Sequence, residues 1–175
     1  EWPTECQHRD ARWAMQLAAF QPDVVLVSGG MWDATDRLIP GQRRWTHLGV
    51  PAYDWYLALE MQHLTRVLGQ TGARVVWTTA PNWNPRYDPA LFMGPPPYRE
   101  ATPGRSDRYN LVLFSAVPQM PRTHVLDLAS WMRAFPGGEF SPALRVDGVH
   151  FTLESTDVVA REFLGPWLGV IAQIR

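Results

Sequence analysis

The sequence predicts an α/β fold built on a parallel sheet. Residues 24–27 and 74–79 form two short apolar runs, the composition expected of strands that are buried on both faces of such a sheet. Helical patterns precede and follow these runs, and this alternation of helix and strand is typical of parallel α/β domains. Hydrophobic residues make up 46% of the chain and charged residues 19%, so we expect residues 1–175 to form a single globular domain.

The first half of the chain predicts helix, strand, helix and strand in that order. Trp13, Leu17 and Phe20 recur at helical spacing and give about residues 8–20 an apolar face, ahead of the first apolar run. Residues 31–50 are expected to form a loop. Pro51 suits the first turn of a second helix, which Gly72 would end, and the second apolar run follows directly.

The second half begins with an irregular stretch. Seven prolines lie within residues 81–105, and we expect this stretch to form a lid or a substrate wall. A helix at about 106–117 and a strand at about 123–127 follow. Thr152 can cap a terminal helix, which the Gly-Pro pair at 165–166 should kink or restart. The inner stripe of that helix would consist of Val159, Phe163, Trp167 and Ile171.

Charge and spacing argue against several classes of function. The net charge is −1 and no basic run occurs, so neither nucleic acid nor an anionic membrane surface is expected as the main partner. The histidines lack the spacing of metal ligands, and residues 28–30 lack the Gly-x-Gly-x-x-Gly pattern of dinucleotide-binding proteins. We therefore expect no metal and no cofactor. No apolar run approaches the ~20 residues that span a bilayer.

Asp147 and His150 are the candidates for chemistry. They should lie with residues 28–33 and 79–82 at the carboxyl edge of the sheet, where parallel α/β proteins bind ligands. A serine hydroxyl needs an imidazole to accept its proton, and the imidazole needs a carboxylate to orient it. Two residues separate this pair, and in a turn before a helix that spacing allows such a contact. An Asp-Gly turn followed by a surface histidine is the alternative reading of the same four residues.

The sequence resembles the SGNH (GDSL-type) hydrolases. Residues 146–152, Val-Asp-Gly-Val-His-Phe-Thr, are similar to the last block of that family, and residues 23–33 are similar to its third block. The likeness is greatest to extracytoplasmic SGNH domains fused to integral-membrane acyltransferases of the O-antigen and peptidoglycan acetylase type, particularly actinobacterial ones. In those domains too, a Thr-Ala-Pro such as residues 79–81 closes a strand. The resemblance extends over nearly all 175 residues.

The resemblance implies a three-layer α/β/α flavodoxin-like fold with His150 as general base, then general acid, and Asp147 as its partner. The family's nucleophile lies in a Gly-Asp-Ser block on the first strand, and no such block occurs here. We therefore expect the serine and the first strand to lie upstream, leaving the edge of the strand at 24–27 unpaired. Trp32 stands where the family has an oxyanion-hole asparagine. The residues assigned to oxyanion stabilisation or substrate binding are Gly30, Trp32, Asp33 and Asn82.

The function implied is that of a serine esterase or O-acyltransferase acting on acyl groups, chiefly acetyl, of cell-surface glycans. An acylated glycan or acyl donor would be the partner, and a membrane acyltransferase domain in the same polypeptide would tether the domain outside the cytoplasm. In that compartment Cys6 would form a disulfide with an upstream cysteine. The alternative is a non-catalytic domain that binds glycan or acyl donor through a tryptophan-rich cleft. A flavodoxin-like regulatory module is less favoured, because no phosphorylatable aspartate turn occurs.

Overall fold

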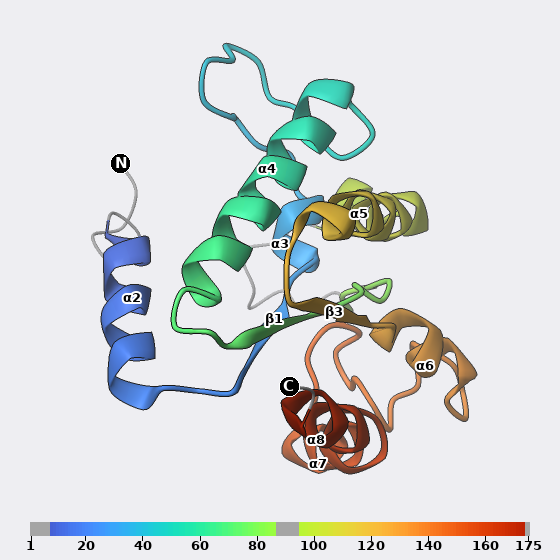
Figure 1. Ribbon diagram of the computed structural model, residues 1–175. Helices are drawn as coiled ribbons and strands as arrows, with labels where there is room; N and C mark the ends of the chain where they lie inside the picture. Colours follow the sequence, from blue (N-terminus) through green and yellow to red (C-terminus); the bar gives the residue numbers. More distant parts are fainter. Residues whose placement is uncertain (1–7, 87–94, 174–175) are drawn as a thin grey trace.

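The computed structural model describes residues 8–86 and 95–173 and has an α/β fold (Figure 1). Its sheet consists of three parallel strands, β1 (Val24–Ser28), β2 (Arg74–Thr78) and β3 (Thr123–Leu126), in the order β1-β2-β3. Each strand matches its predicted range to within one residue. Because the strands are parallel, their carboxyl ends lie on one edge of the sheet. The predicted disulfide of Cys6 falls outside the described residues.

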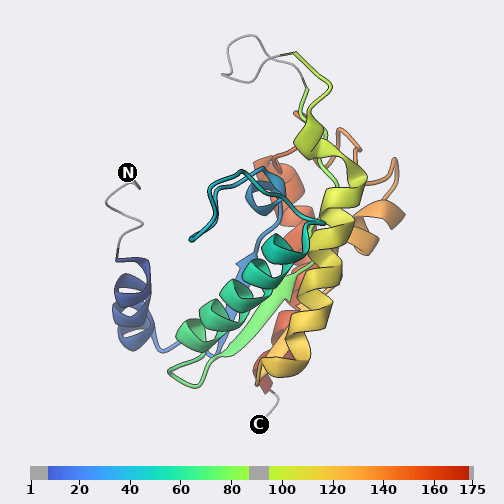
Figure 2. The ribbon, with the colours of Figure 1, turned by 90° about the horizontal axis from the view of Figure 1, so that it is seen from above.

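Two long helices cover one face of the sheet. Helices α4 (Pro51–Leu68) and α5 (Pro103–Ala116) run side by side across it, as two perpendicular views show (Figures 1 and 2). Each helix begins with a proline, which sacrifices no intrahelical hydrogen bond in the first turn. For this reason α5 begins at residue 103, three residues earlier than the predicted start.

The terminal helical segment covers the opposite face (Figure 1). It comprises α7 (Leu153–Val159), the π-helical turn η3 (Ala160–Leu164) and α8 (Gly165–Gln173). The π-helical turn immediately precedes the Gly-Pro pair at which we predicted a kink or restart. Trp167 is 54% exposed, so its predicted place on the inner stripe is wrong. The π-helical turn rotates α8 relative to the regular pattern from which the stripe was inferred. The other three stripe residues are buried, namely Val159, Phe163 and Ile171.

Strand side chains point alternately into the two hydrophobic clusters that these helices form with the sheet. In β2, Val75 and Trp77 belong to the cluster beneath α4, whereas Val76 belongs to the cluster beneath α8. All three residues are at most 4% exposed, so the predicted burial on both faces is confirmed for β2. The same prediction is wrong for β1, where no residue is fully buried and Leu26 is 38% exposed.

Four short helical elements connect the larger ones. They are α3 (Met31–Ala34), η1 (Arg99–Ala101), η2 (Val117–Gln119) and α6 (Leu128–Ala134). The prediction of an unbroken loop over residues 31–50 is therefore wrong, because α3 lies within it. Helix α6 was not predicted, since seven residues are too few to display a periodic pattern. Its amino terminus is capped by Asp127, whose carboxylate accepts a hydrogen bond from the backbone N–H of Ser130.

Helix α2 (Arg9–Phe20) stands apart from the sheet and packs against α4 (Figure 1). Two ion pairs join the helices: Asp10 Oδ2 lies 2.6 Å from His63 Nε2, and Arg9 lies 3.6 Å from Glu60. The helix matches its predicted range. Phe20, which we placed on its apolar face, is nevertheless 82% exposed.

Within the described residues, no helix is long and apolar enough to cross a membrane.

We expect the cluster beneath α8 to dominate stability on its side of the sheet. Leu144 is fully buried there, so Leu144→Ala should lower the free energy of unfolding by about 2–5 kcal/mol. Leu153→Ala is the matched control, because Leu153 is 86% exposed, and its effect should stay within about 0.5 kcal/mol. Urea unfolding measures both values, and similar losses for the two variants would contradict the assignment.

Candidate functional site

One carboxylate holds both the ring and the backbone of His150. Asp147 Oδ2 lies 2.6 Å from His150 Nδ1, while Oδ1 accepts hydrogen bonds from the backbone N–H groups of Val149 and His150 at 2.8 and 2.7 Å. The predicted hydrogen bond between the two side chains is therefore confirmed. Because an ionised carboxylate can only accept, Nδ1 carries the hydrogen. In the neutral ring, Nε2 is then left as the acceptor.

Asp147 is strongly biased toward its ionised form. Partial burial raises the pKa of its carboxyl group, but hydrogen bonds from the His150 ring, the His150 N–H and the Val149 N–H outweigh this effect. Together they lower the pKa to about 2. At neutral pH the carboxylate is thus ready to stabilise a protonated imidazole beside it.

The His150 ring is open to solvent. The His150 side chain is 75% exposed and that of Asp147 is 51% exposed. No described residue hydrogen-bonds to His150 Nε2. An exposed ion pair adds little to stability. The arrangement thus leaves an acceptor nitrogen accessible to a ligand, which is the chemical requirement for a general base.

The turn that carries this pair is bound to the segment following β2. The backbone N–H of Asn84 donates to Gly148 O at 3.1 Å, and that of Arg86 donates to Asp147 O at 2.9 Å. Gly148 has a φ of 81°, and a Cβ atom at this position would clash with the backbone carbonyl of Asn84. Only glycine permits this close approach without strain.

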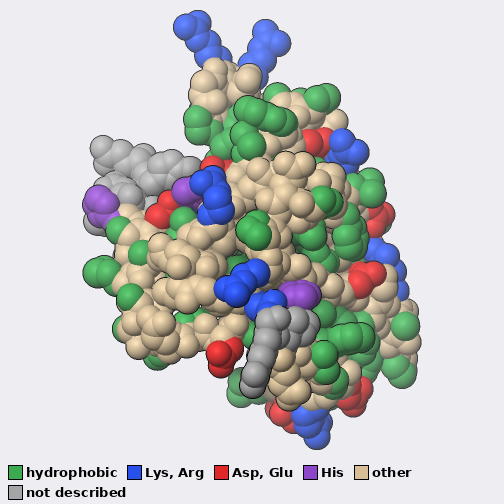
Figure 3. Space-filling model, viewed as in Figure 1, with side chains coloured by type: hydrophobic (Ala, Val, Ile, Leu, Met, Phe, Trp, Pro, Cys, Tyr) green, Lys and Arg blue, Asp and Glu red, His purple; other side chains and the backbone are tan. Residues whose placement is uncertain are grey.

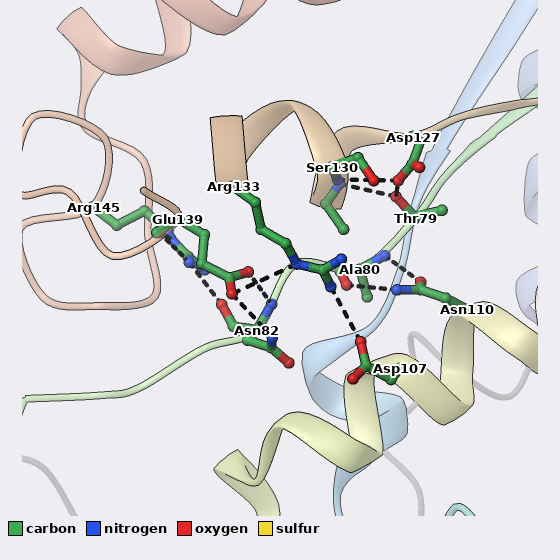
Figure 4. A network of polar contacts seen from close by, with 11 residues as sticks. Thr79, Ala80, Asn82, Asp107, Asn110, Asp127, Ser130, Arg133, Glu139 and Arg145 are labelled. Atoms are coloured by element: carbon green, nitrogen blue, oxygen red, sulfur yellow. Dashed lines mark hydrogen bonds and ion pairs between the residues drawn. The ribbon is translucent and has the colours of Figure 1, made fainter. Parts of the chain in front are cut away.

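A buried polar network fixes the base of the same turn (Figure 4). Arg145 is 2% exposed and donates to the backbone carbonyl oxygens of Asn82 and Glu139. The Glu139 carboxylate in turn accepts from the backbone N–H and the side-chain amide of Asn82, at 2.9 and 3.0 Å. Arg133 links this group to α5 through an ion pair of 3.1 Å with Asp107. Sequence reasoning missed Arg145 and Glu139, since a single charge near a turn carries no distinctive pattern.

Asn82 belongs to this network. Its backbone N–H and one N–H of its side-chain amide donate to the Glu139 carboxylate. Its side-chain oxygen is buried and has no partner among the described residues. In this structure, Asn82 acts as a connection between the end of β2 and the loop before the Asp147 turn.

The Gly30 turn meets the end of β2 from the other side. A Cβ atom on Gly30 would clash with the Ala80 side chain, so the turns after β1 and β2 are in direct contact. The Gly30 N–H donates to Asp33 Oδ2 at 3.3 Å. Burial raises the pKa of Asp33, although the neighbouring Arg37 and the Gly30 N–H oppose this shift. Trp32 is 70% exposed and directs little of its surface into the protein.

The predicted site residues therefore form two groups along one edge. Within the described chain, no hydrogen bond or ion pair joins Gly30, Trp32 or Asp33 to Asp147 or His150. The segment after β2 connects the groups, because Ala80 contacts the first and Asn84 binds the second. This arrangement agrees with the predicted convergence on the carboxyl edge without placing the two groups in direct contact.

No serine hydroxyl of the chain is hydrogen-bonded to His150. All six serines of the chain lie in the described ranges, and none of them hydrogen-bonds to the His150 ring. Ser155 is buried and donates to Leu144 O, and Ser28 accepts from Thr78 at the end of β1. Across residues 8–86 and 95–173, no three His, Cys, Asp or Glu side chains are grouped closely enough to hold a metal ion.

The low pKa of Asp147 leads to a direct prediction for its titration. Its contribution to folding should be complete above about pH 4, the ordinary aspartate pKa, and should be lost as the pH falls through about 2. Carbon NMR of the carboxyl group measures the midpoint. His150→Ala removes one of the hydrogen bonds that lower the pKa, so the midpoint should rise. An unchanged midpoint would contradict the contact.

Gly148 should be harder to replace than a glycine of similar backbone conformation. Gly138→Ala is the control, because Gly138 has a φ of 73° and open space at its Cβ position. We expect Gly138→Ala to cost about 1–2 kcal/mol from the left-handed conformation alone. Gly148→Ala should cost more and should shift the His150 ring resonances, because the turn must also separate from Asn84. Equal unfolding free energies in urea for the two variants would refute the close approach.

Comparison with known proteins does not assign the chain to a family. No family model matches it, and a search of curated proteins finds no match. The site is therefore described by its geometry alone. It consists of an exposed Asp147–His150 pair with a hydrogen bond of 2.6 Å. Arg145 holds the turn that carries this pair at the carboxyl edge of the parallel sheet.

Proposed function

We propose that the chain is an SGNH-type serine esterase or O-acyltransferase domain that acts on acyl groups, chiefly acetyl, of cell-surface glycans. The observation that carries this proposal is the contact between Asp147 Oδ2 and His150 Nδ1, together with the free Nε2 on the solvent side. This is the orientation in which an imidazole can accept the proton of a serine hydroxyl. The proposed setting is extracytoplasmic, with a membrane acyltransferase domain in the same polypeptide.

The sheet supports a flavodoxin-like arrangement. Such sheets have the order 2-1-3-4-5, so their last three strands are adjacent and sequential, as β1, β2 and β3 are. Helices on both faces agree with three layers (Figure 1). In this proposal the first strand would lie next to β1 and would carry the Gly-Asp-Ser nucleophile, from outside these 175 residues.

The proposed reaction proceeds through an acyl-enzyme. His150 Nε2 accepts the serine proton as the serine oxygen attacks the acyl carbonyl, and the charged imidazole is stabilised by Asp147. The carbon–oxygen bond to the sugar then breaks, and His150 returns its proton to the departing sugar oxygen. Water or a sugar hydroxyl, deprotonated by His150, then attacks the acyl-enzyme, and His150 returns this proton to the serine oxygen as its bond to the acyl carbon breaks. Backbone N–H groups near Gly30 are proposed to stabilise the oxyanion in place of the family's asparagine.

A non-catalytic glycan- or acyl-donor-binding domain is the second candidate. The observation that favours it is a set of exposed aromatic and basic side chains between α3 and α4, where basic groups project from the molecule (Figure 3). Trp45 is 71% exposed and follows two exposed arginines, Arg43 and Arg44. Flat aromatic surfaces with polar edges suit the apolar faces of sugars.

Reaction with a fluorophosphonate distinguishes the candidates. Residues 1–175 alone should neither react nor hydrolyse an acetyl ester, whereas a version extended upstream through a Gly-Asp-Ser block should do both. In the extended version, His150→Ala should lower the labelling rate at least about 10³-fold. His47→Ala is the matched control and should leave the rate unchanged.

Two outcomes would contradict the proposal. Labelling of residues 1–175 would show that one of their own six serines is the nucleophile. An extended version that binds acetylated glycan but never reacts would favour the binding domain instead.

A further inference from the structure

A short antiparallel hairpin, residues 37–46, projects beyond the amino end of α4 (Figure 1). Arg37 and Thr46 close it, since the backbone N–H of each donates to the carbonyl oxygen of the other at 2.7 Å. Ile39 is 6% exposed and belongs to the hydrophobic cluster beneath α4. The hairpin therefore has a fixed position on the body of the protein.

The tip of the hairpin is a tight turn. The Gln42 N–H donates to the Ile39 carbonyl at 3.1 Å, which places Pro40 and Gly41 at the two central positions. Gly41 has a φ of 79°, and proline followed by glycine at a positive φ is typical of a type II turn. Residues 40–45 are all exposed. The tip is thus a convex projection of defined shape.

Exposed basic and aromatic side chains are concentrated on this tip. Arg43 and Arg44 have no ion pair or side-chain hydrogen bond to any described residue, and basic groups project from this end of the molecule (Figure 3). Trp45 beside them is 71% exposed. Residues 37–53 contain no aspartate or glutamate, although the whole chain has a net charge of −1. The hairpin is therefore a local cationic patch that the overall charge does not reveal.

We infer that this hairpin binds the surface of an anionic phospholipid bilayer. Tryptophan is enriched at membrane interfaces, where its ring lies at the level of the headgroups, and arginine pairs with phosphate. A convex tip suits a broad surface, whereas small ligands such as sugars are bound in concave sites. The same side chains favour the second candidate function, so a soluble glycan is the alternative occupant. The inference does not depend on the chemistry proposed for His150.

The contact should be weak by itself and should depend on ionic strength. Each arginine close to an anionic bilayer strengthens binding about 5-fold, and salt screens this attraction. A weak contact is sufficient for a domain that is already tethered to the membrane, because its effective concentration at the surface is high. The hairpin follows the carboxyl end of β1 through α3. Its contact would therefore turn the carboxyl edge of the sheet, with the candidate site, toward the bilayer.

Vesicle sedimentation tests the binding of residues 1–175 at low ionic strength. The vesicles contain phosphatidylcholine and phosphatidylglycerol in equal parts. We expect the protein to bind them, and to be released by added salt or by omission of the phosphatidylglycerol. Replacement of both arginines, Arg43→Gln with Arg44→Gln, should lower the partition coefficient about 10- to 30-fold. Trp45→Ala should lower it at least about 5-fold.

Matched controls separate the hairpin from general charge and hydrophobicity. Arg12→Gln with Arg66→Gln removes the same two charges from exposed positions on α2 and in the last turn of α4. Trp167→Ala removes an exposed indole from α8, on the opposite face of the sheet from α4 (Figure 1). Both controls should bind the vesicles as the original protein does.

A gadolinium-chelating lipid in the vesicles locates the contact by NMR. The backbone amides of residues 42–45 should relax faster in its presence, and those of α8 should not. The inference is overturned if the original protein does not bind, if the charge control weakens binding as much as the hairpin variant, or if the faster relaxation lies elsewhere. It is also overturned if a soluble acetylated glycan shifts the Trp45 indole resonance while vesicles leave it unchanged.

Discussion

The buried guanidinium of Arg145 is the constraint on which the candidate site depends. A charge at 2% exposure is tolerated only where acceptors surround it, and burial by itself lowers the pKa of this group, an effect that Glu139 and Asp147 oppose. Arg145 therefore requires the backbone oxygens of Asn82 and Glu139 at fixed positions. Its own carbonyl accepts from the Gly148 N–H at 3.1 Å, which places the Asp147 turn. The position of the exposed pair is thus set by a residue that cannot itself take part in proton transfer.

The elements that were predicted well are those whose pattern is local. The three strands and the helices α2 and α4 follow from runs and spacings that are visible within one segment. The same holds for the contact between Asp147 and His150, which are three residues apart. Helix α6 is too short to show a period, and the π-helical turn changes the period at Trp167. These features depend on packing against the rest of the chain.

The anchoring network could not be predicted for a different reason. Glu139 and Asn82 are 57 positions apart, and Arg145 and Asn82 are 63 positions apart. Nothing in the spacing of a single sequence indicates such pairings. The buried hydroxyl of Tyr109, which has no hydrogen-bond partner among the described residues, is similar, because α5 brings it against Gly29 in the turn after β1. Sequence reasoning located the edge of the sheet where chemistry is expected, and the structure supplied the connections that hold it.

The attachment of α2 has a consequence for motion. In the described chain, α4 is the element against which α2 packs substantially, and the two ion pairs between them are partly exposed. Phe20 remains in solvent and Leu17 is the one buried side chain of the helix. A helix held by so little buried surface can open locally at a free energy well below that of global unfolding. Such opening widens the path to the edge of β1 while the sheet and both of its hydrophobic clusters stay intact.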